Sequence, residues 1–188
     1  AQWAIQPTIA EQQSAAAIAI QAGFSLDEPY VVFAPGANWP NKRWPADHFA
    51  AIADWLASQG YKAVIVGGPG DQELARAIMA GAAVKPAVIV GQTTLKQLAY
   101  ITSKARALIG GDTGPTHLAA AMKTPVIALM GPTDAQRNGP YGQIDRALAT
   151  AHSCHGCWQR SCPKKLDCLA GISVESVRTA LAKLLGGF

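Results

Sequence analysis

The sequence of 188 residues has no apolar stretch that approaches the roughly 20 uninterrupted residues of a membrane-spanning helix. Its first residues lack the basic start and the apolar run of a secretory leader. Glycine and proline are dispersed rather than pooled in a low-complexity tract, and 49% of the residues are hydrophobic, which excludes a disordered chain. We therefore expect a globular protein of the cytoplasm.

Three common catalytic motifs are also missing. No G-x-G-x-x-G follows the first expected strand, and no G-x-x-x-x-G-K-[ST] occurs anywhere, which argues against a dinucleotide oxidoreductase and a P-loop enzyme. The absence of G-x-S-x-G excludes a hydrolase that uses a nucleophile elbow.

Length and charge place weaker limits on the number of domains and on the kind of partner. A chain of this length buries one good core, so a single domain is the default. The formal net charge of +4 is compatible with nucleotide phosphates, nucleic acid or an anionic membrane surface as a partner.

What the sequence does contain is an alternation of short apolar runs and amphipathic segments. Helical spacing between Pro7 and Gly23 predicts one helix that leads into the domain. Five runs have the apolar composition of strands covered on both faces, at 30–34, 63–66, 87–90, 107–110 and 126–130. Helical patterns lie at 46–58, 71–80, 95–103, 115–122 and 174–185. The alternation predicts an α/β fold, a Rossmann-like parallel sheet with helices on both faces, whose ligand lies beyond the carboxyl ends of the strands.

The strongest local signal is the segment 110–121, GGDTGPTHLAAA, in which a strand ends at a glycine turn and a helix begins with proline in its first turn. Unpaired N–H groups at a helix start bind anions, and glycine lets a ligand approach the main chain. A diphosphate would fit there. Alternatively, Asp112 and Thr113 merely cap the helix, and His117 packs under the sheet rather than facing a ligand.

The long loop at 35–45 brings two cations and two indoles to the end of the first strand. Lys42 could neutralise a phosphate as a mobile point charge, and Arg43 could do so with a rigid fork, although such a pair is often only solvated. Trp44 and Pro45 are expected to seat the following helix.

A third glycine-rich strand end, GGPG at 67–70, is followed by two carboxylates, Asp71 and Glu73. Carboxylates at a helix start favour capping, but one of them could instead accept hydrogen bonds from ribose hydroxyls.

Five motifs follow one another in an order and spacing that resemble glycosyltransferase family 9, the ADP-heptose:lipopolysaccharide heptosyltransferases. They are KRWP at 42–45 after a Pro-Gly loop, GG at 67–68, G-x-T-x-L at 91–95, D-T-G-P-x-H-x-A-A at 112–120 and GPT at 131–133. Five ordered motifs over about residues 30–185 are far more specific than any one of them.

The resemblance implies a GT-B enzyme, in which two Rossmann-like domains face each other across a cleft and the C-terminal one holds the nucleotide sugar. This sequence is similar to that C-terminal half. By similarity, the diphosphate would contact Lys42 and the main chain of the fourth motif at 113–114, and Asp71 or Glu73 would meet the ribose. The donor-binding set that follows is Lys42, Asp71, Glu73, Asp112, Thr113, Gly114, Pro115 and His117.

The resemblance also implies a missing part, because the N-terminal acceptor domain supplies the general base in this family. Residues 1–29 are expected to be a connector helix from that domain, and 30–188 the donor-binding domain. The full enzyme would perform an inverting displacement on ADP-heptose or a related donor, with the lipopolysaccharide core as acceptor. This half alone is expected not to transfer sugar, since catalysis needs positioning from both sides of the cleft. No cofactor is required by this scheme.

All the cysteines gather in a basic segment at 152–168, at Cys154, Cys157, Cys162 and Cys168. Four thiolates could surround a structural zinc ion, although this spacing has only one C-x-x-C pair. The alternatives are free thiols in a reducing cytosol, or disulfides formed in air.

Two other functions compete with sugar transfer. A stand-alone nucleotide-binding module would share the same site. A nucleic-acid-binding module would need a larger basic surface interleaved with aromatic residues, and here only Trp158 lies among the cations, so no nucleic-acid partner is expected. The full-length enzyme would work in the cytoplasm, peripheral to the inner membrane that anchors its acceptor.

Overall fold

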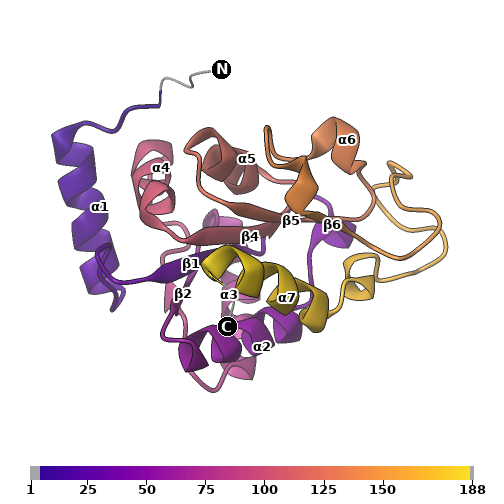
Figure 1. The fold of residues 1–188 in the computed structure, drawn as a ribbon, viewed down its shortest axis with the longest axis horizontal. Coiled ribbons are helices and arrows are strands. Elements are labelled where there is room, and N and C mark those ends of the chain that lie inside the picture. The colour runs from indigo at the N-terminus through magenta and orange to yellow at the C-terminus, as the bar shows by residue number, and fades with distance from the viewer. Residues whose placement is uncertain (1–4, 187–188) are drawn as a thin grey trace.

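The computed structural model describes residues 5–186, which fold around a parallel sheet of six strands in the order β3-β2-β1-β4-β5-β6 (Figure 1). The strands are β1 Tyr30–Ala34, β2 Lys62–Ile65, β3 Ala87–Val88, β4 Ala107–Gly111, β5 Val126–Met130 and β6 Ala147–Ala149. This is the order of a doubly wound sheet of the Rossmann type, so the predicted α/β fold is confirmed. Residues 1–4 of the predicted connector and 187–188 of the predicted domain lie outside the described part.

The helices cover both faces of the sheet, as Figure 1 shows. The main ones are α1 Ile9–Gln21, α2 Ala46–Ser58, α3 Gln72–Gly81, α4 Leu95–Lys104, α5 Gly114–Ala121 and α7 Val174–Leu185. One core lies under α2, α3 and α7, and the second lies under α1, α4 and α5. Alternate residues of each strand enter the two cores: Val31 and Phe33 point to the first, Tyr30 and Val32 to the second.

The helix α1, which was predicted as a connector, packs onto α4. Ala15 and Ala19 are fully buried in the second core. The helix begins with a capping box in which Thr8 accepts a hydrogen bond from the amide of Glu11, and Glu11 pairs with Lys96 at 3.2 Å. Within the residues described, this helix is therefore part of the domain's packing, and its role as a connector stays a prediction.

The observed elements differ from the predicted ones in a few places. β3 ends at Val88, although Ile89 still donates its amide to the carbonyl of Ile65. β6, the edge strand, was not predicted, because its sequence Ala-Leu-Ala carries little strand signal and only its pairing with β5 defines it. The short helix α6 Ala135–Asn138 was also missed.

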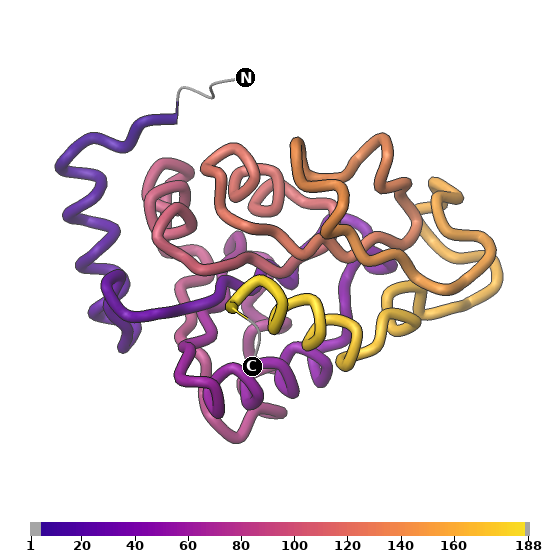
Figure 2. Tube along the Cα trace, in the orientation of Figure 1, coloured from indigo at the N-terminus to yellow at the C-terminus, as the bar shows by residue number. Residues whose placement is uncertain are grey.

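The cysteine-rich segment 152–168 forms the irregular loops at the edge of the molecule where the strands β4 and β5 end, as the tube in Figure 2 shows in orange and yellow. It is flanked by the 3-10 turns η3 Ile144–Arg146 and η4 Leu169–Gly171. The two remaining 3-10 turns are η1 Pro40–Lys42 and η2 Pro69–Asp71, in the loops that follow β1 and β2. Between residues 5 and 186, the structure holds no helix whose length and apolarity would suit a bilayer crossing.

Candidate functional site

A cavity of about 640 Å³ opens where the strands β1, β2 and β4 end. Ala34 of β1 lies beside Gly110 of β4 in the parallel register, so the loops after these two strands start at the same level. The loops after β1, β2 and β4 together form the walls. The volume is in the usual range of about 300–1,000 Å³ for a small-molecule site.

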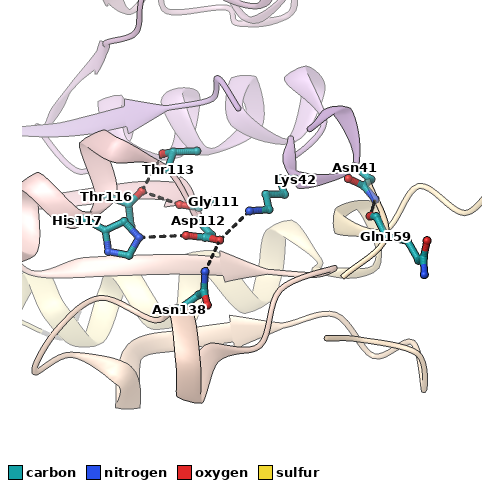
Figure 3. Close-up of polar contacts among 9 residues, drawn as sticks. All are labelled: Asn41, Lys42, Gly111, Asp112, Thr113, Thr116, His117, Asn138 and Gln159. Atoms are coloured by element: carbon teal, nitrogen blue, oxygen red, sulfur yellow. Dashed lines mark hydrogen bonds and ion pairs between the residues drawn. The ribbon is translucent and has the colours of Figure 1, made fainter. Parts of the chain in front are cut away.

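Asp112 stands at the centre of a polar cluster on this cavity (Figure 3). One carboxylate oxygen, Oδ2, accepts hydrogen bonds from Lys42 Nζ at 2.7 Å and from Asn138 Nδ2 at 3.1 Å. The other, Oδ1, lies 3.0 Å from His117 Nε2. Because an ionised carboxylate can only accept, this contact places the proton of the imidazole on Nε2.

The environment of Asp112 keeps it ionised. Its side chain is only 8% exposed, and this burial alone would raise the pKa of the carboxyl. The hydrogen bonds from His117 and Lys42 and the positive charge of Lys42 outweigh the burial and hold the pKa well below its ordinary value. The buried Thr133 hydroxyl, which has no partner in hydrogen-bond geometry, lies near enough to lower that pKa further.

Lys42 reaches this cluster because its loop is pressed against the end of β4. A methyl group on Gly111 would lie 2.6 Å from the carbonyl oxygen of Lys42, so only glycine permits this approach. Trp44 anchors the other end of the loop: it is buried, donates its indole N–H to the carbonyl of Ile172 at 2.9 Å, and packs edge-on against Phe49. The prediction that Trp44 seats the following helix is thus confirmed.

The start of α5 is open toward the cavity. Thr113 makes no side-chain capping hydrogen bond; its hydroxyl lies 3.3 Å from that of Thr116, which bonds the carbonyl oxygen of Gly111. Among the described residues, no acceptor is bonded to the amides of Gly114 and Thr116. The simple capping interpretation is therefore wrong, and the helix start keeps the unpaired donors that an anion site needs.

His117 faces the cavity rather than the underside of the sheet, since its side chain is 45% exposed and lines the cavity wall. Pro115 also lines it, one residue into the helix.

The two acidic residues that were predicted to bind the donor, Asp71 and Glu73, lie in different places. Asp71 lines the cavity, and its carboxylate accepts a hydrogen bond from the amide of Gly68 at 2.9 Å, so it caps the turn η2. A methyl group on Gly36 would lie 2.2 Å from the Asp71 carboxylate, so a larger residue in this loop would displace that carboxylate. Glu73 instead points outward on α3 and pairs with Arg76. The structure brings seven of the eight predicted donor-binding residues to the cavity and leaves Glu73 outside it.

The four cysteines are free thiols. Burial, and then the nearby charges of Cys157, Cys154 and Cys162, raise the pKa of Cys168 to about 11. This favours the protonated thiol at neutral pH. Nowhere in residues 5–186 are three or more His, Cys, Asp or Glu side chains arranged to hold a metal. Structural zinc stays a prediction that this geometry does not support.

Sequence reasoning missed two residues of the Asp112 cluster. Asn138 is on α6, and Thr133 ends the GPT motif after β5, so both come from a segment that follows a different strand. The GPT motif was a signal for Thr133. Nothing local marks Asn138, because its role depends on the position of α6 beside Asp112.

A doubly wound sheet with a polar cavity beyond its strand ends defines a Rossmann-like domain. Among solved structures, this domain is similar to one half of GT-B glycosyltransferases. The structure of a glycosyltransferase family 9 protein from Veillonella parvula DSM 2008 is 31% identical, with a TM-score of 0.82 over 96% of this chain and 52% of that one. The structure of E. coli ADP-heptose lipopolysaccharide heptosyltransferase II is 26% identical, with a TM-score of 0.74 over the same shares.

The sequence places the chain within that class. Residues 2–167 match glycosyltransferase family 9 (heptosyltransferase). Lipopolysaccharide heptosyltransferase 1 from Pseudomonas aeruginosa is 31% identical over 135 residues, which cover 71% of this chain and 38% of that protein. The chain belongs to glycosyltransferase family 9. It spans only about half of the chains in the two solved structures, and less of the Pseudomonas relative.

Proposed function

We propose that this chain is the donor-binding, C-terminal half of an inverting heptosyltransferase of lipopolysaccharide synthesis. The observation that carries the proposal is the cavity in which the open start of α5 meets two cations, Lys42 and Arg43, at the carboxyl ends of the strands. The names of the relatives supply the sugar and the base: the E. coli structure is that of an ADP-heptose enzyme.

In this proposal the diphosphate lies against α5. The amides of Gly114 and Thr116 lie at the positive end of the helix dipole, and Lys42 adds a full charge. Asp112 keeps Lys42 at the cavity through the 2.7 Å ion pair and leaves His117 oriented beside it. Asp71 would accept a hydrogen bond from a ribose hydroxyl with the carboxylate lone pairs that Gly68 does not use.

The chemistry that this site supports is stabilisation of the leaving group. A base on the facing half would take the proton of an acceptor hydroxyl, whose oxygen bonds the anomeric carbon as the bond to the diphosphate oxygen breaks. The departing ADP gains negative charge, which the fixed N–H donors and Lys42 stabilise, each by about 2–4 kcal/mol if water is excluded. No metal is needed to hold this charge, and the chain alone is expected to bind donor without transferring it.

The acceptor and the cellular place are parts of the same proposal. The relatives are named for lipopolysaccharide. We propose that the acceptor is an inner-core sugar of this lipid at the cytoplasmic face of the inner membrane. The absence of a nucleic-acid partner stays a prediction.

Calorimetric titration of this chain with ADP, UDP, GDP and ADP-heptose tests the proposal. We expect selective binding of ADP and ADP-heptose, unchanged by EDTA and weakened about tenfold or more by Lys42→Ala, because a hydrogen bond to a charged group contributes about 1.5–3 kcal/mol. Lys183→Ala, which removes an exposed cation from α7, is the matched control. Equal affinity for all three nucleoside diphosphates would favour the stand-alone nucleotide-binding module, and no binding by the wild type would reject the assigned site.

A further inference from the structure

A second cavity, of about 550 Å³, lies beside the donor cavity. Its walls are the segment 40–46, which contains η1, and the segment 160–167 of the cysteine-rich loop. Arg43 lines both cavities. Whatever binds in the second cavity is therefore a neighbour of whatever binds in the first.

The walls of this second cavity carry an excess of positive charge. Arg43, Arg160 and Lys165 line it, and Asp167 is the one carboxylate among its lining residues. None of the three cations forms an ion pair with a described acidic residue. Arg43 uses Nε to bond the carbonyl of Ala37 at 2.9 Å, which leaves the paired Nη groups of its fork for another acceptor.

The segment that carries these cations is held in place by contacts with the donor loop. Asn41 donates its side-chain amide to the carbonyl of Gln159 at 2.7 Å (Figure 3), and the guanidinium of Arg160 lies 5.6 Å from the centre of the Trp39 ring. The amide of Lys165 bonds the carbonyl of Cys162, and Lys165 itself has a left-handed backbone with φ 55°. A left-handed backbone is unfavourable for a non-glycine residue, so the surrounding fold must hold this turn.

We propose that this second cavity binds the anionic group, phosphate or carboxylate, of a sugar acceptor. Three cations with one opposing carboxylate favour an anion, and a fork such as Arg43 suits the two oxygens of either group. The volume of about 550 Å³ suits a small ligand such as a single sugar. The term acceptor rests on the proposed function, while the binding of an anionic sugar does not.

The position of Arg43 gives this subsite a consequence for the reaction. An anionic sugar held by the free end of the Arg43 fork would lie next to the donor diphosphate, on the same side of the sheet. The subsite would then help to select acceptors that carry a negative charge.

The test is an NMR titration of the ¹⁵N-labelled chain with glucose 6-phosphate, with glucuronate and with neutral glucose, in the presence and absence of ADP. We expect both anionic sugars, and not glucose, to shift the backbone amides of 160–167 even when ADP is present. The variant Arg160→Gln, Lys165→Asn should weaken this binding about tenfold or more, because two charged contacts are lost. Asparagine tolerates the left-handed backbone at position 165, so the turn should survive.

The matched control is Lys104→Gln, Lys183→Gln, which removes the same charge from exposed residues outside both wall segments of the second cavity. It should bind glucose 6-phosphate within about twofold of the wild type, since distant surface charges are screened. If both variants lost the same affinity for glucose 6-phosphate, net charge alone would explain the binding, and the proposal would be overturned.

Three further outcomes of these titrations would also test the proposal. Shifts only at 113–117 would mean that the sugar phosphate enters the donor cavity, which contradicts a second site. Binding to phosphatidylglycerol vesicles without any response to the free anionic sugars would make the segment a membrane contact and likewise overturn the proposal. Shifts at 160–167 in a chain that does not respond to ADP would support the anion site while rejecting the proposed donor function.

Discussion

Asp112 shows at the scale of one residue how the site resolves the cost of a buried charge. A carboxylate that is 8% exposed would be unfavourable alone, but lysine, imidazole and amide donors surround it, so the charged form is the stable one. The same carboxylate keeps Lys42 at the cavity when no donor is bound. A residue that the motif marks as ligand-facing is therefore also the anchor of the site's cation.

The stability that Asp112 contributes should depend on pH in a defined direction. Because its folded-state pKa is lowered below the ordinary value of 3.8, the contribution is complete above that value and is lost as the pH falls below it. At neutral pH, Asp112→Asn should lower the free energy of unfolding by about 1–3 kcal/mol. The difference between wild type and variant, measured by urea unfolding between pH 5 and pH 2, should shrink with acidity; a constant difference would contradict the assigned pKa shift.

The cysteines should differ in reactivity according to their burial. Cys157 is exposed, Cys154 and Cys162 are partly buried, and Cys168 is buried with its pKa raised from 9.0 to about 11. At pH 8 its thiolate fraction is about a hundredfold smaller than that of an ordinary thiol, so alkylation followed by mass spectrometry should label it last. If Zn²⁺ added beforehand protects all four thiols together, the predicted zinc site exists after a rearrangement; unchanged labelling would reject it.

At the scale of elements, α1 is the least expected part of the packing. Its sequence predicted a helix between Pro7 and Gly23, and the structure places Ile9–Gln21 there. What the periodicity could not predict was the surface against which the helix lies, because alanines are compatible with either a buried or an exposed face. The tight approach to α4 uses those small side chains.

Overpacking tests whether α1 belongs to this domain. Ala19→Leu adds volume at a fully buried position and should cost about 1–3 kcal/mol, whereas Ala17→Leu changes an exposed position of the same helix and should stay within about 0.5 kcal/mol. Thermal unfolding of the two variants provides the comparison. Equal midpoints would mean that α1 behaves as a detached connector.

The predicted helices and strands agree best where an apolar run or a helical period covers the whole element. The strands 30–34 and 126–130 and the helices 46–58 and 174–185 were predicted with the observed bounds. Short or edge elements such as β6 and α6 were missed, because two or three apolar residues give no period and such elements depend on their neighbours.

At the scale of the whole molecule, donor binding and folding should be linked. A ligand that binds only the folded chain stabilises it by about 2.7 kcal/mol at a concentration of a hundred times its dissociation constant. For a domain of this size, that corresponds to a rise of roughly 5–10 °C in the unfolding midpoint. We expect ADP to produce this rise in a thermal scan and the same ADP concentration to produce a smaller one in Lys42→Ala; identical rises would place ADP away from Lys42.

The sequence by itself determined the alternation of strands and helices, the glycine-rich strand ends and the family, because periodicity and motifs are local properties of the chain. Only the tertiary structure decided which side chains meet. Lys42 and Asp112 are 70 residues apart in sequence, and Asn41 and Gln159 are 118 apart. Asn138 contacts Asp112, and Glu73 points away from the cavity, for the same physical reason. Loops after parallel strands converge only when the sheet has formed, and the direction of each side chain then follows from the packing of its own turn.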